Sequence, residues 1–269
     1  MSVTKGAGGS LRGGSLPIAQ TIKESLGLPC IAHFTCRDLL PEEVENQLVD
    51  HHLFGIRNIL ALRGDPPQGT VNWSPREGSY PFAYQLVEQI CALNRGSYLE
   101  RSGFSVTSRE RTDFCVGVAC YPDHLSTAER LEYHQRKFQA GAEYAISQML
   151  FDHDSYARFC DEIDATSPMP ILPGTRLLKS REQAAKMSKR FEIPIPDWYL
   201  KLLPETDREA SADRSLEAFF TLTERLKDRG APGIHIFVLS DVELAEQSLR
   251  QLAKLNEARS RHHDSVGSR

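Results

Sequence analysis

The chain alternates short apolar runs with longer amphipathic stretches, and this alternation limits its fold more than any other feature. Seven runs rich in β-branched and other apolar residues predict strands at 2–4, 30–35, 56–62, 114–121, 144–151, 169–172 and 233–239. Helical periodicity predicts helices near 16–26, 41–54, 81–99, 126–140, 153–165, 180–190, 208–229 and 241–256. Strands that are nearly continuous in apolar residues are typical of parallel sheets covered on both faces. The sequence therefore predicts an α/β fold with a parallel sheet.

The junctions between these runs carry their own signals. Ser180 predicts a helix start, and Gly141 and Gly230 predict the ends of helices that lead into strands. The prolines within 193–198 interrupt the alternation of strand and helix patterns and predict a short extra helix. Three prolines and two glycines within 66–80 predict a long loop after the third strand.

The number of units decides between two parallel architectures. An open doubly wound sheet also fits the alternation, but the chain has no GxGxxG after its first strand, and Gly6-Ala7-Gly8-Gly9 has the wrong spacing. A barrel is favoured, and an ordinary barrel closes with eight strands. The prediction is a (β/α)8 TIM-type barrel with one strand missing. Residues 1–256 are expected to form one βα-barrel catalytic domain, and the polar residues 257–269 a disordered tail.

Composition excludes several classes of partner. The net charge of −4 gives no electrostatic argument for nucleic acid or an anionic membrane, and no apolar run approaches the ~20 residues of a membrane span. Six cysteines without CxxC spacing, several of them inside strand-like runs, are expected to be reduced thiols of a cytoplasmic protein. No metal site is expected, because His51-His52 and His262-His263 lack partner ligands. A small-molecule ligand is expected, and a homo-oligomer is left open.

The active site of a parallel barrel lies at the carboxyl ends of its strands. That rule selects Thr4, His33, Thr35, Arg63-Gly64-Asp65, Tyr121, Gln148, Gly174-Thr175 and Leu239-Ser240. Asp65, beside a glycine that would let a flat ligand approach the backbone, suits catalysis, although an Arg–Asp pair that fixes a turn explains it equally well. His33 is more simply a hydrogen-bonded structural histidine, and Lys137 a solvated helical charge. Gln148 could pair with the edge of a heterocycle, and the chain lacks a GxSxG nucleophile motif.

Several motifs occur in a fixed order along the chain. These are residues 2–10, His33-Phe34-Thr35-Cys36, Leu62-Arg63-Gly64-Asp65-Pro66, Ala119-Cys120-Tyr121-Pro122, Ala140-Gly141-Ala142, Ile146-Ser147-Gln148, Leu172-Pro173-Gly174 and Gly233-Ile234-His235. From about residue 1 to 255 the chain thereby resembles the methylenetetrahydrofolate reductase family, which consists of flavoprotein barrels.

The resemblance implies a reaction and a set of site residues. The family reduces 5,10-methylenetetrahydrofolate to 5-methyltetrahydrofolate by a ping-pong route in which NADH or NADPH first reduces FAD, as part of one-carbon and methionine metabolism. The implied FAD contacts are Thr4, His33, Arg63, Gly64, Asp65, Ala83, Tyr121 and Lys137. Asp65 also matches the catalytic carboxylate that stabilises positive charge on the folate iminium. Gln148, Gln183 and Leu239 match folate contacts, and the sequence does not distinguish NADH from NADPH.

The resemblance also identifies which unit is missing. The family carries its general acid, a glutamate, on the first strand, upstream of the motif that begins here at Ser2. The first β-strand is therefore expected to be the missing one, and residues 1–269 alone are expected to show little turnover. A start codon placed too far downstream would explain this, and so would a shortened paralogue with an open sheet edge. The alternative function is a catalytically impaired or redirected paralogue that binds folate or flavin without the reductase reaction.

Individual positions depart from the family pattern. Arg130 stands where an aspartate near the FAD ribose or adenine is frequent, and Phe82 and Phe237 replace tyrosines. Ser240-Asp241 replaces an Asn-Arg pair, and Met187 replaces an aromatic residue. These departures bear on folate affinity and nicotinamide preference more than on the fold.

Overall fold

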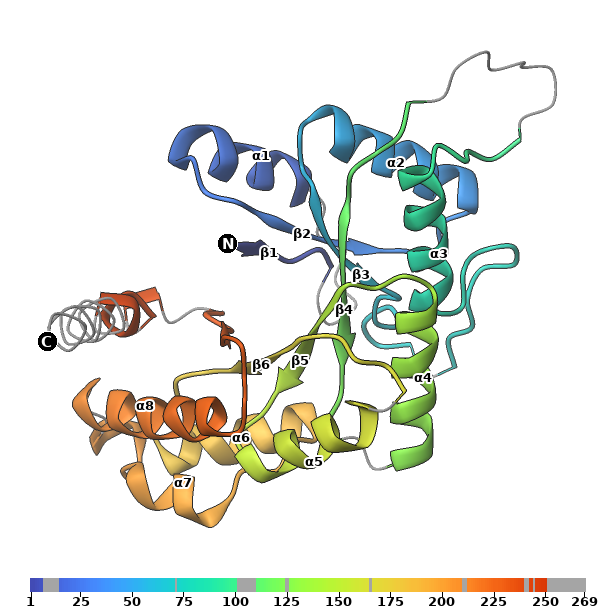
Figure 1. The fold of residues 1–269 in the computed structure, drawn as a ribbon. Helices are drawn as coiled ribbons and strands as arrows, with labels where there is room; N and C mark the ends of the chain where they lie inside the picture. Colours follow the sequence, from blue (N-terminus) through green and yellow to red (C-terminus); the bar gives the residue numbers. More distant parts are fainter. Residues whose placement is uncertain are drawn as a thin grey trace, which may run out of the picture. The chain divides into compact units, whose positions relative to one another are not determined.

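The computed structural model describes residues 1–6, 15–70, 72–100, 110–123, 126–164, 166–209, 212–239, 242–243 and 245–250 (Figure 1). The predicted tail, half of the last predicted helix and the Ser240-Asp241 departure lie outside these residues. No helix among them is long and apolar enough to cross a membrane. All six cysteines are free, as predicted.

The described strands follow one another in sheet order, β1-β2-β3-β4-β5-β6-β7. They are β1 (Ser2–Val3), β2 (Ile31–Thr35), β3 (Asn58–Leu62), β4 (Cys115–Cys120), β5 (Tyr144–Met149), β6 (Ile171–Thr175) and β7 (His235–Ile236). The pairs β1–β2, β2–β3, β3–β4 and β6–β7 are parallel. Seven parallel strands with alternating helices confirm a TIM-type (β/α)8 fold that lacks a strand. That the missing strand is the first stays a prediction.

The helices occupy the stretches predicted for them. They are α1 (Ser15–Leu26), α2 (Pro41–Leu53), α3 (Ala83–Asn94), α4 (Thr127–Gln139), α5 (His153–Asp164), α6 (Arg181–Phe191), α7 (Asp197–Leu202), the 3-10 turn η2 (Asp207–Glu209) and α8 (Ala212–Asp228). The short extra helix after the prolines is confirmed as α7. Gly141 and Gly230 follow the last turns of α4 and α8 with φ of 109° and 88°, a left-handed conformation that glycine adopts without steric cost.

Contacts divide the chain into two compact units, each with its own interior. Unit one comprises Met1–Ile146 and Cys160–Ile171, and unit two comprises Ser147–Phe159 and Leu172–Arg269. The single catalytic domain expected over residues 1–256 remains a prediction.

Unit one is built on the parallel ladder of β2, β3 and β4. The β2–β3 register runs from Ile31 opposite Asn58 to Thr35 opposite Leu62. Their alternate side chains are fully buried: Ala32, Phe34, Ile59, Ala61, Val116 and Val118. The amphipathic face of α3 also buries Leu86, Val87, Ile90 and Leu93, which recur at helical spacing. Leu60 and His33, which alternate with these residues, are buried as well, so the strands are buried on both faces and their sequence is nearly continuous in apolar residues.

Unit two differs from the prediction at the ends of β6 and β7. The Pro173-Gly174 dipeptide predicts a turn, yet β6 continues to Thr175. Gly174 pairs with His235 in β7, and its amide donates a 2.8 Å hydrogen bond to Ser147 Oγ. Gly174 and Thr175 therefore lie inside a strand rather than beyond its end, and β7 is shorter than predicted.

A Gly174→Ala substitution is expected to lower the free energy of unfolding by about 1–3 kcal/mol. A Cβ at this position would lie 2.5 Å from both Phe237 Cε2 and the backbone oxygen of Ser147, so the backbone itself would have to shift. Gly233→Ala is the matched control, since its Cβ would lie 3.6 Å from Leu172 Cδ2, an ordinary contact. Urea unfolding of both variants measures the difference, and equal losses would contradict the packing argument.

Candidate functional site

Unit one contains a cavity of about 400 Å³ where β3 and β4 end, at the start of α3 and along α4. Its lining comes from four segments: Ala61–Asp65, Phe82–Tyr84, Ala119–Tyr121, and Glu129, Arg130, Tyr133, His134 and Lys137 of α4. The volume lies within the usual range of small-molecule sites. The carboxyl ends of strands are also the position at which a parallel barrel binds its ligands.

The loop after β3 supplies a backbone wall and a carboxylate. Gly64 has φ of 93°, and a Cβ there would lie 3.0 Å from Arg37 Cβ and 3.3 Å from Thr35 Cβ. Both the backbone angle and the lack of space therefore favour glycine. Arg37 donates a hydrogen bond to the Asp65 carbonyl, which ties down the loop while the Asp65 side chain remains exposed. The Arg63 guanidinium carbon lies 5.7 Å from the Trp73 ring centroid.

Tyr121 and Lys137 form the side of the cavity at the end of β4. Lys137 is only 9% exposed, and its Nζ donates a 2.7 Å hydrogen bond to the Ala119 carbonyl and lies 5.8 Å from the Tyr121 ring centroid. Burial, helped by the positive charge of Arg63 and opposed by Cys120, lowers the Lys137 pKa to about 8. Lys137 is therefore not the solvated charge that its helical position suggested.

The Tyr121 ring is 46% exposed and lines this cavity. Its pKa is raised, first by desolvation of the hydroxyl and then by the negative charge of Asp65. Asp65 and Tyr121 both line the cavity, so the carboxylate and the phenol share one environment.

Helix α4 contributes further lining residues: Arg130, which the sequence marks as a departure from the family pattern, and Tyr133 and His134, which sequence reasoning missed. The Arg130 Nη1 donates a 2.7 Å hydrogen bond to the Pro122 carbonyl, and its Nη2 lies 2.5 Å from Glu162 Oε2. His134 is 2% exposed, and Tyr133 joins it in the lining. Arg130, Tyr133, His134 and Lys137 recur at i, i+3, i+4 and i+7, so the periodicity of α4 was the signal available to find them.

Aromatic rings form another part of the wall. Phe82 and Tyr84 are stacked with ring centroids 5.3 Å apart and an interplanar angle of 10°. Tyr133 lies 5.6 Å from Phe82, and Arg136 donates a 3.1 Å hydrogen bond to the Tyr84 hydroxyl from outside the cavity. Phe82, which replaces a tyrosine of the family pattern, thus packs against the rings of Tyr84 and Tyr133.

His134 predicts a pH dependence of stability. Burial, followed by the charge of Lys137 and opposed by a hydrogen bond with the Ser167 backbone, lowers the His134 pKa from 6.5 to about 4. The unfolded chain takes up the proton below pH ~6.5 and the folded chain only near pH 4, so stability is lost as pH falls between these values. His134→Gln is therefore expected to reduce the loss between pH 7 and pH 5 by about 2 kcal/mol.

Urea unfolding at the two pH values measures this difference. A His52→Gln variant, which alters a histidine 3.3 Å from Asp113, controls for the removal of a histidine in the same unit. If parent and His134→Gln lose the same stability on acidification, His134 does not stay neutral in the folded chain.

The cavity brings together six of the eight predicted cofactor contacts. Arg63, Gly64, Asp65, Ala83, Tyr121 and Lys137 all line it. Thr4 follows β1 and is exposed, and neither it nor His33 is among the lining residues of this cavity. His33 lies in the middle of β2 rather than at its end, because the ladder with β3 continues to Thr35. It is 7% exposed, and its Nε2 lies 2.6 Å from Ser2 Oγ, which supports a structural role.

The predicted folate contacts belong to unit two. Gln148 lies near the end of β5, and its Oε1 accepts a 2.9 Å hydrogen bond from the Met149 amide. Gln183 lies in the first turn of α6, where its Oε1 accepts a 2.8 Å bond from the Lys179 amide beside the predicted Ser180 cap. Leu239 is 58% exposed with φ of 51°. Both glutamine amides therefore have local structural partners, and their contact with folate stays a prediction.

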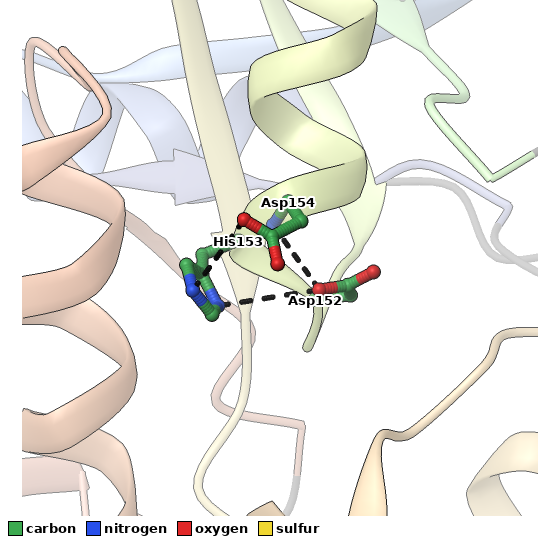
Figure 2. A group of neighbouring side chains, drawn as sticks. All are labelled: Asp152, His153 and Asp154. Atoms are coloured by element: carbon green, nitrogen blue, oxygen red, sulfur yellow. Dashed lines mark hydrogen bonds and ion pairs between the residues drawn. The ribbon is translucent and has the colours of Figure 1, made fainter. Parts of the chain in front are cut away.

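Three potential metal ligands lie together at the start of α5 (Figure 2). Ligand atoms of Asp152, His153 and Asp154 lie within 4.8 Å of one another. The carboxylates already have other partners, since Asp154 Oδ1 lies 2.6 Å from Arg229 Nη2 and Asp152 accepts hydrogen bonds from Ser155 and the Asp154 amide. This cluster is explained by helix capping and ion pairing.

Comparison with known proteins gives a consistent result across the chain. The family model for methylenetetrahydrofolate reductase matches residues 1–253. The 5,10-methylenetetrahydrofolate reductase of Escherichia coli K12 is 30% identical over 252 residues, which cover 91% of this chain and 77% of that protein. Methylenetetrahydrofolate reductase 2 of Saccharomyces cerevisiae is 28% identical over 259 residues, which cover 93% of this chain and 40% of the yeast protein. The chain thus spans about two fifths of the yeast relative.

One solved structure supports the fold. A Clostridium thermocellum protein that binds two copies of 5-methyl-5,6,7,8-tetrahydrofolic acid has a TM-score of 0.51 and 16% identity, covering 88% of this chain and 78% of that one. At this identity the likeness shows the fold alone. The match over residues 1–253 is the decisive one: this chain belongs to the methylenetetrahydrofolate reductase family.

Proposed function

We propose that this chain provides the catalytic domain, residues 1–256, of an enzyme that reduces 5,10-methylenetetrahydrofolate to 5-methyltetrahydrofolate. The electrons come from NADH or NADPH through FAD, in a reaction of the cytoplasm. Family membership supports the reaction, and free thiols are typical of a reducing compartment. The observation that carries the proposal is the single cavity lined by Arg63, Gly64, Asp65, Ala83, Tyr121 and Lys137.

The residues of the cavity fit a flat anionic dinucleotide such as FAD. Gly64 lines the cavity with backbone alone, because its φ of 93° and the nearby Arg37 and Thr35 side chains leave no room for a side chain. Tyr121 offers a partly exposed aromatic face, and Arg63 and Lys137 offer positive charge. When bound, the flavin supplies the hydride chemistry that the side chains themselves lack.

Each residue then has a role of its own. Asp65 places a negative charge where the methylene iminium of the folate gains positive charge, so the carboxylate stabilises the transition state more than the ground state. Lys137 holds the end of β4 through the Ala119 carbonyl and keeps positive charge beside Tyr121. The loop around Gly64 orients the ligand relative to Asp65.

Purification and assay test the proposal directly. The natural protein that contains these residues is expected to retain FAD, seen as flavin absorbance, and to oxidise NADH or NADPH in a manner dependent on methylenetetrahydrofolate. A protein that neither retains FAD nor takes it up would overturn the proposal. Bound FAD without folate-dependent oxidation would instead favour the paralogue that has lost or redirected the reductase reaction.

A further inference from the structure

Two cations on one face of α4 donate to backbone carbonyls on either side of Tyr121. Lys137 donates to Ala119, two residues before the tyrosine, and Arg130 donates to Pro122, the residue after it; both hydrogen bonds are 2.7 Å long. Positions 130 and 137 lie two helical turns apart, so both side chains leave α4 on the same face. The chain on either side of Tyr121 is thereby fixed to one helix.

The Arg130 guanidinium is itself held by α5. Its Nη2 lies 2.5 Å from Glu162 Oε2, and the two side chains are 13% and 33% exposed. A guanidinium presents donors in a rigid planar fork, so one side chain can bind a carbonyl and a carboxylate at fixed relative positions. Arg130 therefore connects three segments of unit one: α4, the turn after β4, and the end of α5 that carries Glu162.

The charge of Arg130 is balanced by a partner of opposite charge, and the neighbouring histidine is held neutral. His134 lies between the two cations on α4 and is buried in the same lining, and burial together with Lys137 holds it neutral at pH 7. Glu162 balances the charge of Arg130, and Cys120 and Arg63 are the other groups that act on Lys137. The guanidinium is thus engaged with protein partners, which argues for support of the wall rather than direct binding of a ligand.

We propose that Arg130 is a positioning residue for the cavity, which holds the Tyr121–Pro122 turn against Glu162 so that the Tyr121 ring stays in the cavity wall. The part that concerns ligand binding rests on the proposed function, whereas the restraint of the turn does not. The variants are Arg130→Gln, which removes the charge and the fork, and Glu162→Gln, which keeps a hydrogen-bonding side chain of the same size.

The first measurement needs no ligand. Hydrogen–deuterium exchange of a peptide that covers residues 119–123 should be about tenfold faster in Arg130→Gln and intermediate in Glu162→Gln, because the turn opens more often. Lys186→Gln is the control, as it removes a 2.6 Å ion pair with Glu182 on an exposed face of unit two. If exchange at residues 119–123 is unchanged in both Arg130→Gln and Glu162→Gln, the proposal is overturned.

The second measurement is a double-mutant cycle with Tyr121→Ala, read as the dissociation constant of FAD from flavin fluorescence. If Arg130 acts through Tyr121, Arg130→Gln weakens binding about tenfold in the parent and less than about twofold in the Tyr121→Ala background. Arg130→Lys, which keeps the charge, should restore part of the affinity. Additive effects would mean that Arg130 acts by another route and would overturn the proposal.

The two measurements also separate this inference from the proposed function. A parent protein that binds no FAD contradicts the proposed function, while the exchange experiment still decides whether Arg130 restrains the turn. Should Arg130→Gln fail to fold, Glu162→Gln provides the same exchange and affinity comparisons.

Discussion

An Asp65→Asn variant of the natural protein is expected to retain FAD and to lose about 10²–10³-fold in kcat for methylenetetrahydrofolate reduction. Asparagine keeps the size of the side chain but removes the negative charge that faces the developing iminium. Because Asp65 is exposed at the edge of the cavity, its replacement should leave the fold intact. The loss should therefore appear in turnover rather than in the amount of folded protein.

A second assay and a control variant test whether the loss of turnover comes from the missing negative charge of Asp65. Reduction of an artificial quinone by NADH needs the flavin but not the folate, so Asp65→Asn should affect it far less than the folate reaction. Glu77→Gln, which neutralises an exposed carboxylate in the 66–80 loop that follows Asp65, should leave both reactions near the parent rate. Equal losses in the quinone and folate reactions would show that Asp65 serves the flavin and not the iminium.

The fold was predictable from sequence because its signals are local. Parallel strands covered on both faces need unbroken apolar runs, and these marked all seven strands. Ser180 does cap α6, with its Oγ accepting a 3.0 Å hydrogen bond from the Gln183 amide, as its position before an amphipathic stretch predicted. The end of β6 was not predictable, because Gly174 and Thr175 pair with His235 and Ile236, residues far along the chain.

The site was predictable only in part for a related reason. The rule for strand ends selected Arg63, Gly64, Asp65 and Tyr121, and the cavity contains all four. The rule for strand ends does not predict which helical residues point into the cavity. Lys137, considered by itself, was expected to be a solvent-exposed charge. Its burial follows from the packing of α4 against β4 and α3 (Figure 1), which the helical spacing of Lys137 with Arg130 and His134 indicates but Lys137 alone does not.

Stability should depend strongly on the aromatic interior of unit two. Phe219 of α8 is fully buried, in a cluster with Leu177 and Leu216 against which Phe220 and Ile236 pack. A Phe219→Ala variant is expected to lose about 3–5 kcal/mol in the free energy of unfolding, because a buried ring leaves a cavity that its neighbours fill only partly.

Phe220→Ala is the matched control for Phe219→Ala. Phe220 is the next residue of the same helix, and its ring centroid lies 5.5 Å from that of Phe219, yet it is only partly buried. Its loss is expected to be about 1 kcal/mol. Urea unfolding followed by circular dichroism gives both values, with exchange of peptides from α8 assigning the loss to unit two. Equal losses in the free energy of unfolding of Phe219→Ala and Phe220→Ala would mean that the face of α8 that carries Phe219 is not the one that packs into the interior.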